Sequence, residues 1–265
     1  MPRSTPHLRA LSKDDERTTG DETPVLASSS AAPSPPAPSS AALAEPSILR
    51  LMQLVSPLFP VGGYAYSQGL EPAIEQRWVS SPESLYAWLR GLLHNGVARL
   101  DLPILARAHA AWRNKDAVRG AELAKLALAL RGSRELLEED RKLGGALARA
   151  LHGLQVAEAT NWLEQRHTSY PVLFALACVE WAIPVRSAAL AFAYVWSETQ
   201  VSAASRLMPL GQTACQMVLS QLLETIPAAV DVALQLDEAD IGSLAPAHAI
   251  ASAWHETQYS RLFRS

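Results

Sequence analysis

The residues with the clearest potential for chemistry lie in the stretch 54–78, which combines prolines, paired glycines, two tyrosines, a serine and a carboxylate. Gly62-Gly63 allows a backbone turn that residues with a Cβ rarely make. A phosphate-binding loop needs a lysine and then a serine or threonine after its last glycine. Here the last glycine is followed by a leucine and by Glu71, whose carboxylate would repel a triphosphate. The stretch therefore predicts a tight turn that leads into a helix, not a nucleotide site.

Nucleophilic and acid–base catalysis are not indicated by the same stretch. Ser67 lacks the G-x-S-x-G surroundings of a nucleophile elbow and has no histidine nearby in the sequence. Glu71 and Glu75 would lie one turn apart on a helix, where an exposed face or the helix dipole accounts for them without acid–base work. We expect no catalytic residue and no enzyme activity.

A metal site built by this chain alone is also not predicted. The seven histidines form no H-x-x-x-H, H-x-H or Cys-His cluster. Cys178 and Cys215 stand in apolar, helix-like surroundings without a C-x-x-C motif. We interpret them as small buried hydrophobic residues, which fits a reducing compartment.

The composition excludes several classes of protein. The chain has 265 residues, of which 49% are hydrophobic, so it can bury a sizeable core. A net charge of -3 gives no overall signature of nucleic-acid binding. No uninterrupted apolar run is long enough to cross a membrane, and we expect a soluble chain.

The first 45 residues have a composition of their own. No aromatic residue precedes Phe59, and the segment 27–46 consists almost entirely of Ala, Ser and Pro. Such a segment cannot bury enough apolar surface to offset its ordering entropy, so we predict a disordered leader over residues 1–45. Its acidic residues argue against a transit peptide, and it has no apolar region of a secretion signal.

Residues 46–265 show helical periodicity and no convincing strand pattern. We predict one all-α, helical-bundle-like domain of about eight to ten helices of ordinary length. A short helix is expected from Ser47 until Pro57 ends it, and Pro72 must lie near the start of its helix. The residues expected to cap helix N-termini are Ser80-Ser81, Asp101, Asp116 and Ser133. Gly144-Gly145 falls inside a predicted helix, which indicates the close approach of another segment.

The C-terminal residues mix aromatic and basic side chains, with Tyr259, Leu262 and Phe263 next to Arg261 and Arg264. Chain ends fray unless something holds them, and interface anchors favour aromatic residues and arginine. The sequence leaves two interpretations open: a packed terminal helix, or a tail that a partner orders.

Several segments in the chain resemble, in order and spacing, the motifs of the UreF family of urease accessory proteins. These are 62–71 (GGYAYSQGLE), 101–103 (DLP), 133–136 (SREL) with 144–145 (GG) downstream, and 209–213 (PLGQT). The terminal 255–265 (HETQYSRLFRS) is similar to the family's ending. The resemblance covers the chain from residue 46 to residue 265. Pro72 and the leader depart from the family pattern.

The resemblance implies an all-helical, cytoplasmic chaperone for urease maturation that is not an enzyme. Proteins of this family form homodimers, bind a UreD scaffold (also called UreH) and the UreG GTPase, and help to deliver nickel to apo-urease. Their C-terminal tail becomes ordered against the scaffold. No tightly bound cofactor is implied, and nickel would pass transiently, since it accepts imidazole, carboxylate and water ligands.

On this basis we predict that the turn and the C-terminal aromatics form the face for the scaffold. Arg206 is a candidate contact for the GTPase, although a helix C-terminus also favours arginine through its dipole. The predicted partner-binding residues are Gly62, Gly63, Tyr64, Tyr66, Ser67, Glu71, Arg206, Gln212, Tyr259, Arg261, Leu262 and Phe263.

Three alternatives remain at this stage. The chain could activate the GTPase by supplying an arginine to the phosphates. It could be a helical adaptor unconnected with metals. A helical DNA-binding regulator is disfavoured by the negative net charge.

Overall fold

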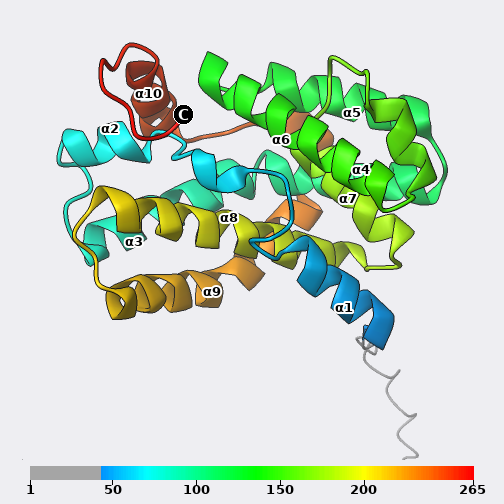
Figure 1. Ribbon diagram of the computed structural model, residues 1–265, viewed down its shortest axis with the longest axis horizontal. Helices are drawn as coiled ribbons and strands as arrows, with labels where there is room; N and C mark the ends of the chain where they lie inside the picture. The colour runs from blue at the N-terminus through cyan, green and yellow to red at the C-terminus, as the bar shows by residue number, and fades with distance from the viewer. Residues whose placement is uncertain (1–42) are drawn as a thin grey trace, which may run out of the picture. The chain divides into compact units, whose positions relative to one another are not determined.

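The computed structural model describes residues 43–265, and this part of the chain is helical without a strand, as predicted (Figure 1). The α-helices are α1 (Glu45–Leu54), α2 (Leu70–Glu75), α3 (Pro82–Leu92), α4 (Asp101–Arg113), α5 (Ala117–Ala129), α6 (Arg134–Gly153), α7 (Tyr170–Glu180), α8 (Val185–Leu207), α9 (Gln212–Gln235) and α10 (Pro246–His255). Short helical turns are η1 (Gly63–Ala65), η2 (Leu93–Val97), η3 (Ala157–Trp162) and η4 (Glu238–Asp240).

The N-terminal boundary of the helical region lies close to the predicted one. The predicted disordered leader falls, except for its last three residues, outside the described part of the chain. The first helix begins at Glu45, two residues before the expected Ser47, because Pro46 is accommodated in the first turn. Pro72 likewise stands in the first turn of α2, where its missing N–H costs nothing.

Three of the predicted helix caps are present. The Ser81 side chain accepts a hydrogen bond from the backbone N–H of Ser84 and so begins α3. Asp116 caps α5 and Ser133 caps α6 in the same way, through the N–H three residues further on.

Asp101 was predicted to cap a helix, and that prediction is wrong. It is the first residue of α4, and its carboxylate lies 2.6 Å from Nη2 of Arg131. The same Nη2 is 2.8 Å from the Asp140 carboxylate. Because Asp101 is buried, its charge is compensated by the guanidinium, and the side chain does not turn back to the helix backbone.

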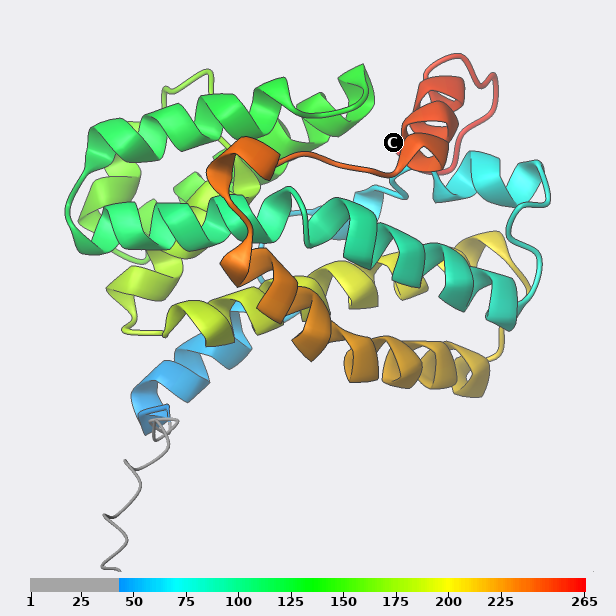
Figure 2. The same cartoon turned by 180° about the vertical axis from the view of Figure 1, so that it is seen from behind.

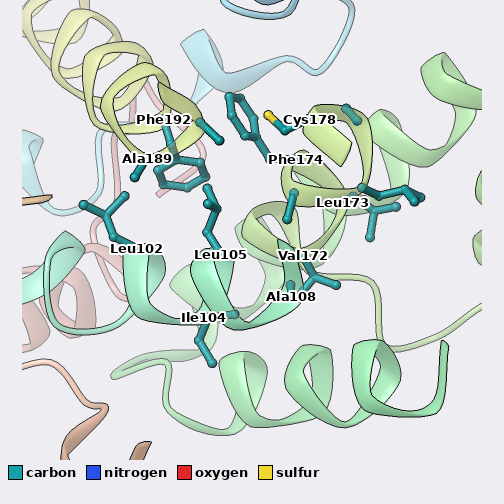
Figure 3. Close-up of a cluster of buried hydrophobic side chains, with 14 of the residues drawn as sticks. Leu102, Ile104, Leu105, Ala108, Val172, Leu173, Phe174, Cys178, Ala189 and Phe192 are labelled. Atoms are coloured by element: carbon teal, nitrogen blue, oxygen red, sulfur yellow. The ribbon is translucent and has the colours of Figure 1, made fainter. Parts of the chain in front are cut away.

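The core lies between α4, α7 and α8 (Figure 3). Helix α7 is apolar on all sides because it is surrounded by other helices, and α8 contributes small alanines that let its neighbours approach closely. The side chains labelled in Figure 3 are Leu102, Ile104, Leu105 and Ala108 of α4, Val172, Leu173, Phe174 and Cys178 of α7, and Ala189 and Phe192 of α8. Cys178 and Cys215 are both buried, as expected.

The glycine pair inside α6 has two different surroundings. A Cβ at Gly144 would lie 2.9 Å from backbone atoms of Ser169, so the chain leading into α7 packs directly against the helix. A Cβ at Gly145 would meet nothing closer than 3.5 Å. The predicted close approach is therefore confirmed for Gly144 alone.

Helix α9 packs along α3 and α8 and forms one side of a second apolar cluster (Figure 2). By length and composition α9 could cross a membrane, with a mean hydropathy of 1.4 over its most apolar window. Its buried face, however, packs on α8, α3 and α4. Met217, Leu223 and Val232 remain exposed on its outer face.

The last helix, α10, packs on α2 and α6, and the chain after it returns across the start of α2 (Figure 1). This arrangement brings the C-terminal segment 256–265 next to the glycine-rich turn, almost 200 positions earlier in the sequence. We call this segment the tail, and the segment 62–71 the junction.

Candidate partner-binding site

Glu71 holds the tail to the start of α2. Its carboxylate accepts hydrogen bonds from the backbone N–H groups of Leu262, at 2.8 Å, and Phe263, at 3.0 Å. Nε2 of His255 lies 3.3 Å from the same carboxylate. Glu71 is only 9% exposed, so these bonds form in a site with little competing water. One buried carboxylate therefore provides the hydrogen-bond acceptors for two backbone N–H groups of the tail.

Ser67 fixes the end of the tail from the other side. Its backbone N–H donates to the backbone oxygen of Ser265 at 2.7 Å, and its hydroxyl donates to the same oxygen at 2.5 Å. The backbone N–H of Arg264 donates to the carbonyl of Ala65 at 2.9 Å. Ser67 and Ser265 are both fully buried. The tail is thus paired with the junction through two backbone hydrogen bonds.

Glu139 of α6 joins the tail and the junction to the centre of the domain. It accepts hydrogen bonds from the hydroxyl of Ser265 and from the side-chain amide of Gln68, each at 2.7 Å. The oxygen of the Gln68 amide accepts from Nε1 of Trp196 at 2.8 Å. Burial raises the pKa of the Glu139 carboxyl to about 7, because few charges compensate its ionised form. This group can therefore change its charge near neutral pH.

Glu135, one turn before Glu139 on α6, anchors the beginning of the tail. One oxygen lies 2.7 Å from Nδ1 of His255, and the other 2.9 Å from Nη1 of Arg261. The His255 ring therefore stands between the Glu135 and Glu71 carboxylates. The arrangement ties the C-terminus of α10 to both α6 and α2.

Arg206 meets the same assembly from the last turn of α8. Its guanidinium carbon lies 6.0 Å from the centre of the Phe263 ring, and its Nη1 is 3.4 Å from the carbonyl oxygen of Tyr64. Phe263 itself is buried in the second apolar cluster. The Tyr64 hydroxyl donates to Glu198, and burial together with that carboxylate raises the pKa of the phenol above its usual value. The structure thus brings Arg206, which was predicted for the GTPase, next to Tyr64 and Phe263, which were predicted for the scaffold.

The outer surface of the tail carries apolar side chains that nothing in the described part of the chain covers. Tyr259 is fully exposed, and Leu262 is 64% exposed. The side chain of Arg261, which is next to Leu262 in the sequence, is 41% exposed. An exposed tyrosine and leucine held on a rigid backbone are typical of a protein-binding surface.

The other predicted partner-binding residues differ in their exposure and in their contacts with the tail. Gly62 is exposed with a φ of 81°, a left-handed conformation that suits glycine, and Gly63 begins η1. Tyr66 is buried and acts inside the site. Gln212 is the exposed first residue of α9, and no hydrogen bond within residues 43–265 connects its side chain with the tail.

Sequence reasoning missed five residues of this site: Gln68, Glu135, Glu139, His255 and Ser265. The spacing of Glu135 and Glu139 places both on one face of α6, which was a usable signal. Their function depends on α10 and the tail reaching that face, which no local pattern indicates.

A cavity of about 490 Å³ lies inward of Gln68 and Glu139 and is mostly lined by apolar side chains. The buried ion cluster of Asp101, Arg131 and Asp140 lies at its wall. Burial raises the pKa of the Asp140 carboxyl, although Arg131 and the backbone N–H of Tyr170 oppose this. Within residues 43–265 no group of three or more His, Cys, Asp or Glu side chains is arranged to hold a metal ion.

The chain is similar in sequence to known proteins over most of its length. The family model described as UreF matches residues 79–223. The urease accessory protein UreF of Alkalilimnicola ehrlichii is 47% identical over 216 residues, which are 82% of this chain and 95% of that protein. The proteins of the same name from Chromohalobacter salexigens and Hahella chejuensis are 46% and 44% identical, over 81% and 82% of this chain and 93% and 98% of their own lengths.

This chain belongs to the UreF family of urease accessory proteins. The resemblance drawn from the sequence motifs is therefore confirmed. The matched UreF region runs from Val79, three residues before α3, to the middle of α9, so it includes the α6 carboxylates but neither the junction nor the tail. An accessory protein assists the urease without being the urease itself.

Proposed function

We propose that this UreF-family protein is a urease maturation chaperone that bridges a UreD/UreH-type scaffold and a UreG-type GTPase while nickel is inserted into apo-urease. The junction and the tail are the face for the scaffold. The protein works in the cytoplasm as a homodimer and does not itself catalyse a reaction. The observation that carries the proposal is the tail, which the buried Glu71 and Glu139 and the partly buried Glu135 hold through hydrogen bonds while Tyr259 and Leu262 are exposed.

The chemistry of the site supports binding over catalysis. Glu71, Glu135 and Glu139 each already accept two hydrogen bonds from the chain itself. A general base must keep an accessible lone pair for a substrate, and a nucleophile needs a base beside it. The serine of the junction donates to a backbone oxygen instead. The hydrogen bonds of the three carboxylates and the serine hold the tail in position.

Nickel is the cargo in this proposal. The part of the chain that the structure describes builds no three-ligand cluster of its own. Nickel therefore passes transiently along polar groups that this protein shares with its partners, because imidazole, carboxylate and water all serve as its ligands.

A deletion strain tests the function. We expect urease activity to be lost without this protein, to stay low when nickel is added to the medium, and to return when the gene is supplied again. Normal activity in the deletion strain would favour the alternative of a helical adaptor unconnected with metals.

A second candidate function is regulation of the GTPase, favoured by the exposed Arg206 at the edge of the tail. Here Arg206 contacts the GTPase and an arginine of this chain assists its turnover. Loss of GTPase stimulation in Arg206→Ala, with the scaffold still bound, supports this function. Unchanged recruitment and turnover leave Arg206 with only its role at the end of α8.

A further inference from the structure

A second concave surface lies on the far side of the junction, between α6 and the segment 162–168. It is a cleft of about 450 Å³ that also contacts Val61, Gly62 and the tail residue Arg264. We call it the basic groove, because its lining includes five cationic side chains and one carboxylate. The cations are Arg141, Lys142, Arg149, Arg166 and Arg264, and the carboxylate is Glu138.

Most of this positive charge is not neutralised by the chain. Arg141 forms an ion pair with Glu138 at 3.2 Å, and its Nε donates to the carbonyl of Arg166. Within residues 43–265 the other four cations of the groove form no ion pair. The whole chain carries a net charge of -3, whereas the groove lining has five cations and one carboxylate. Like charges gathered in a concave surface repel one another and concentrate the field on an anionic ligand.

The groove also has an apolar part. Leu163 is 38% exposed at its edge, and Val61 is half-buried there. Gly145 contributes no side chain, which keeps the wall formed by α6 low at that point. A ligand that fits this lining carries negative charges and at least one apolar group.

The position on α6 argues against a phosphate site. Phosphates are typically bound by free backbone N–H groups at a helix N-terminus or in a glycine-rich loop. The groove residues of α6 lie beyond its first turn, where the N–H groups are already bonded within the helix. The five cationic side chains of the groove are long and flexible, and such side chains suit carboxylates spread along a peptide.

We propose that the basic groove binds an acidic segment of a partner protein, with an apolar side chain of that segment packed on Leu163 and Val61. The groove is complete only when the tail is docked, because Arg264 reaches it from the tail and is paired through its backbone with Ala65. This proposal extends the proposed function by a second contact surface, which shares Gly62 and Tyr66 with the junction and Arg264 with the tail.

The test uses the purified full chain and a fluorescein-labelled peptide in which Glu alternates with Leu. The groove variant is Lys142→Gln with Arg149→Gln, which removes two charges without adding bulk. The matched control is Lys115→Gln with Lys125→Gln, since both of these lysines are exposed and lie outside the groove. Fluorescence anisotropy measures the affinity at low and at high salt, and circular dichroism checks that both variants are folded.

We expect the groove variant to bind the peptide about tenfold more weakly, and the control to change the affinity by less than about twofold. Binding by the wild type should weaken as salt is raised. Equal weakening by the control pair, or no weakening by the groove pair, overturns the proposal. Displacement of the peptide by ATP or inorganic phosphate at constant ionic strength overturns it in favour of a phosphate ligand. Because this assay contains no urease, its failure is distinct from a failure of the proposed function.

Discussion

Replacing Glu71 with glutamine is the sharpest perturbation of the tail. The substitution keeps the size of the side chain but removes its charge and one of its two acceptor oxygens. In the wild type both oxygens are used, one by the N–H of Leu262 and the other by the N–H of Phe263. In Glu71→Gln one of these amides faces an NH₂ group and loses its partner. The change therefore acts on the docking of the tail and on the contact between Glu71 and His255.

The size of the effect follows from these bonds. A hydrogen bond to a charged group is worth about 1.5–3 kcal/mol, and a buried donor left without a partner costs a similar amount. We expect tail docking to lose roughly 2–3 kcal/mol, which corresponds to a rise of about 30-fold to 150-fold in the undocked population. The global unfolding transition should move much less, because the tail is a local unit.

Hydrogen–deuterium exchange of the segment 256–265, followed by mass spectrometry, measures this population. Glu75→Gln is the matched control, since Glu75 is one turn further along α2 and exposed. We expect fast exchange in the tail of Glu71→Gln and wild-type exchange in Glu75→Gln. The same exchange in both variants, whether slow or fast, would refute the assigned role of Glu71.

Three further predictions concern pH, packing and assembly. The pKa of Glu139 is raised from 4.5 to about 7, so the unfolded chain releases this proton first and the free energy of unfolding should fall as pH rises between these values. Glu139→Gln should flatten that slope in urea titrations. Gly144→Ala should destabilise the fold by roughly 1–3 kcal/mol, because its Cβ would meet the backbone before α7, whereas Gly145→Ala should be neutral or stabilising by up to about 1 kcal/mol in thermal melts. We propose that the two copies of the homodimer meet at the exposed apolar face of α9, so Met217→Glu should give a monomer in light scattering, while Leu58→Glu should not.

Local sequence chemistry predicted much of the fold because helix starts are local events. Ser81, Asp116 and Ser133 cap the helices that follow them, and the prolines stand where helices tolerate them. Gly144 indicated a close approach because glycine inside a helix needs a compensating contact. The prediction that Asp101 caps a helix was wrong because its partner is not local. The side chain pairs with Arg131, thirty positions away, and does not bond to the nearby helix backbone.

The candidate site was predicted in part. The aromatic and glycine-rich pattern identified the junction and the tail, but it could not show that they pair with each other. That pairing depends on Glu71 reaching the amides of Leu262 and Phe263, a separation of about 190 residues that only the packing of α10 on α2 and α6 closes. His255 looked like an isolated histidine, although two carboxylates from different helices meet at its ring.

The central claim is that the exposed side of the docked tail binds the scaffold. The most direct measurement is the affinity of the purified chain for a UreD/UreH-type scaffold protein, compared between Tyr259→Ala with Leu262→Ala and the control Leu58→Ala, which alters another exposed leucine. We predict that the tail variant binds at least about tenfold more weakly and that the control binds like the wild type. Wild-type affinity in the tail variant would contradict the claim.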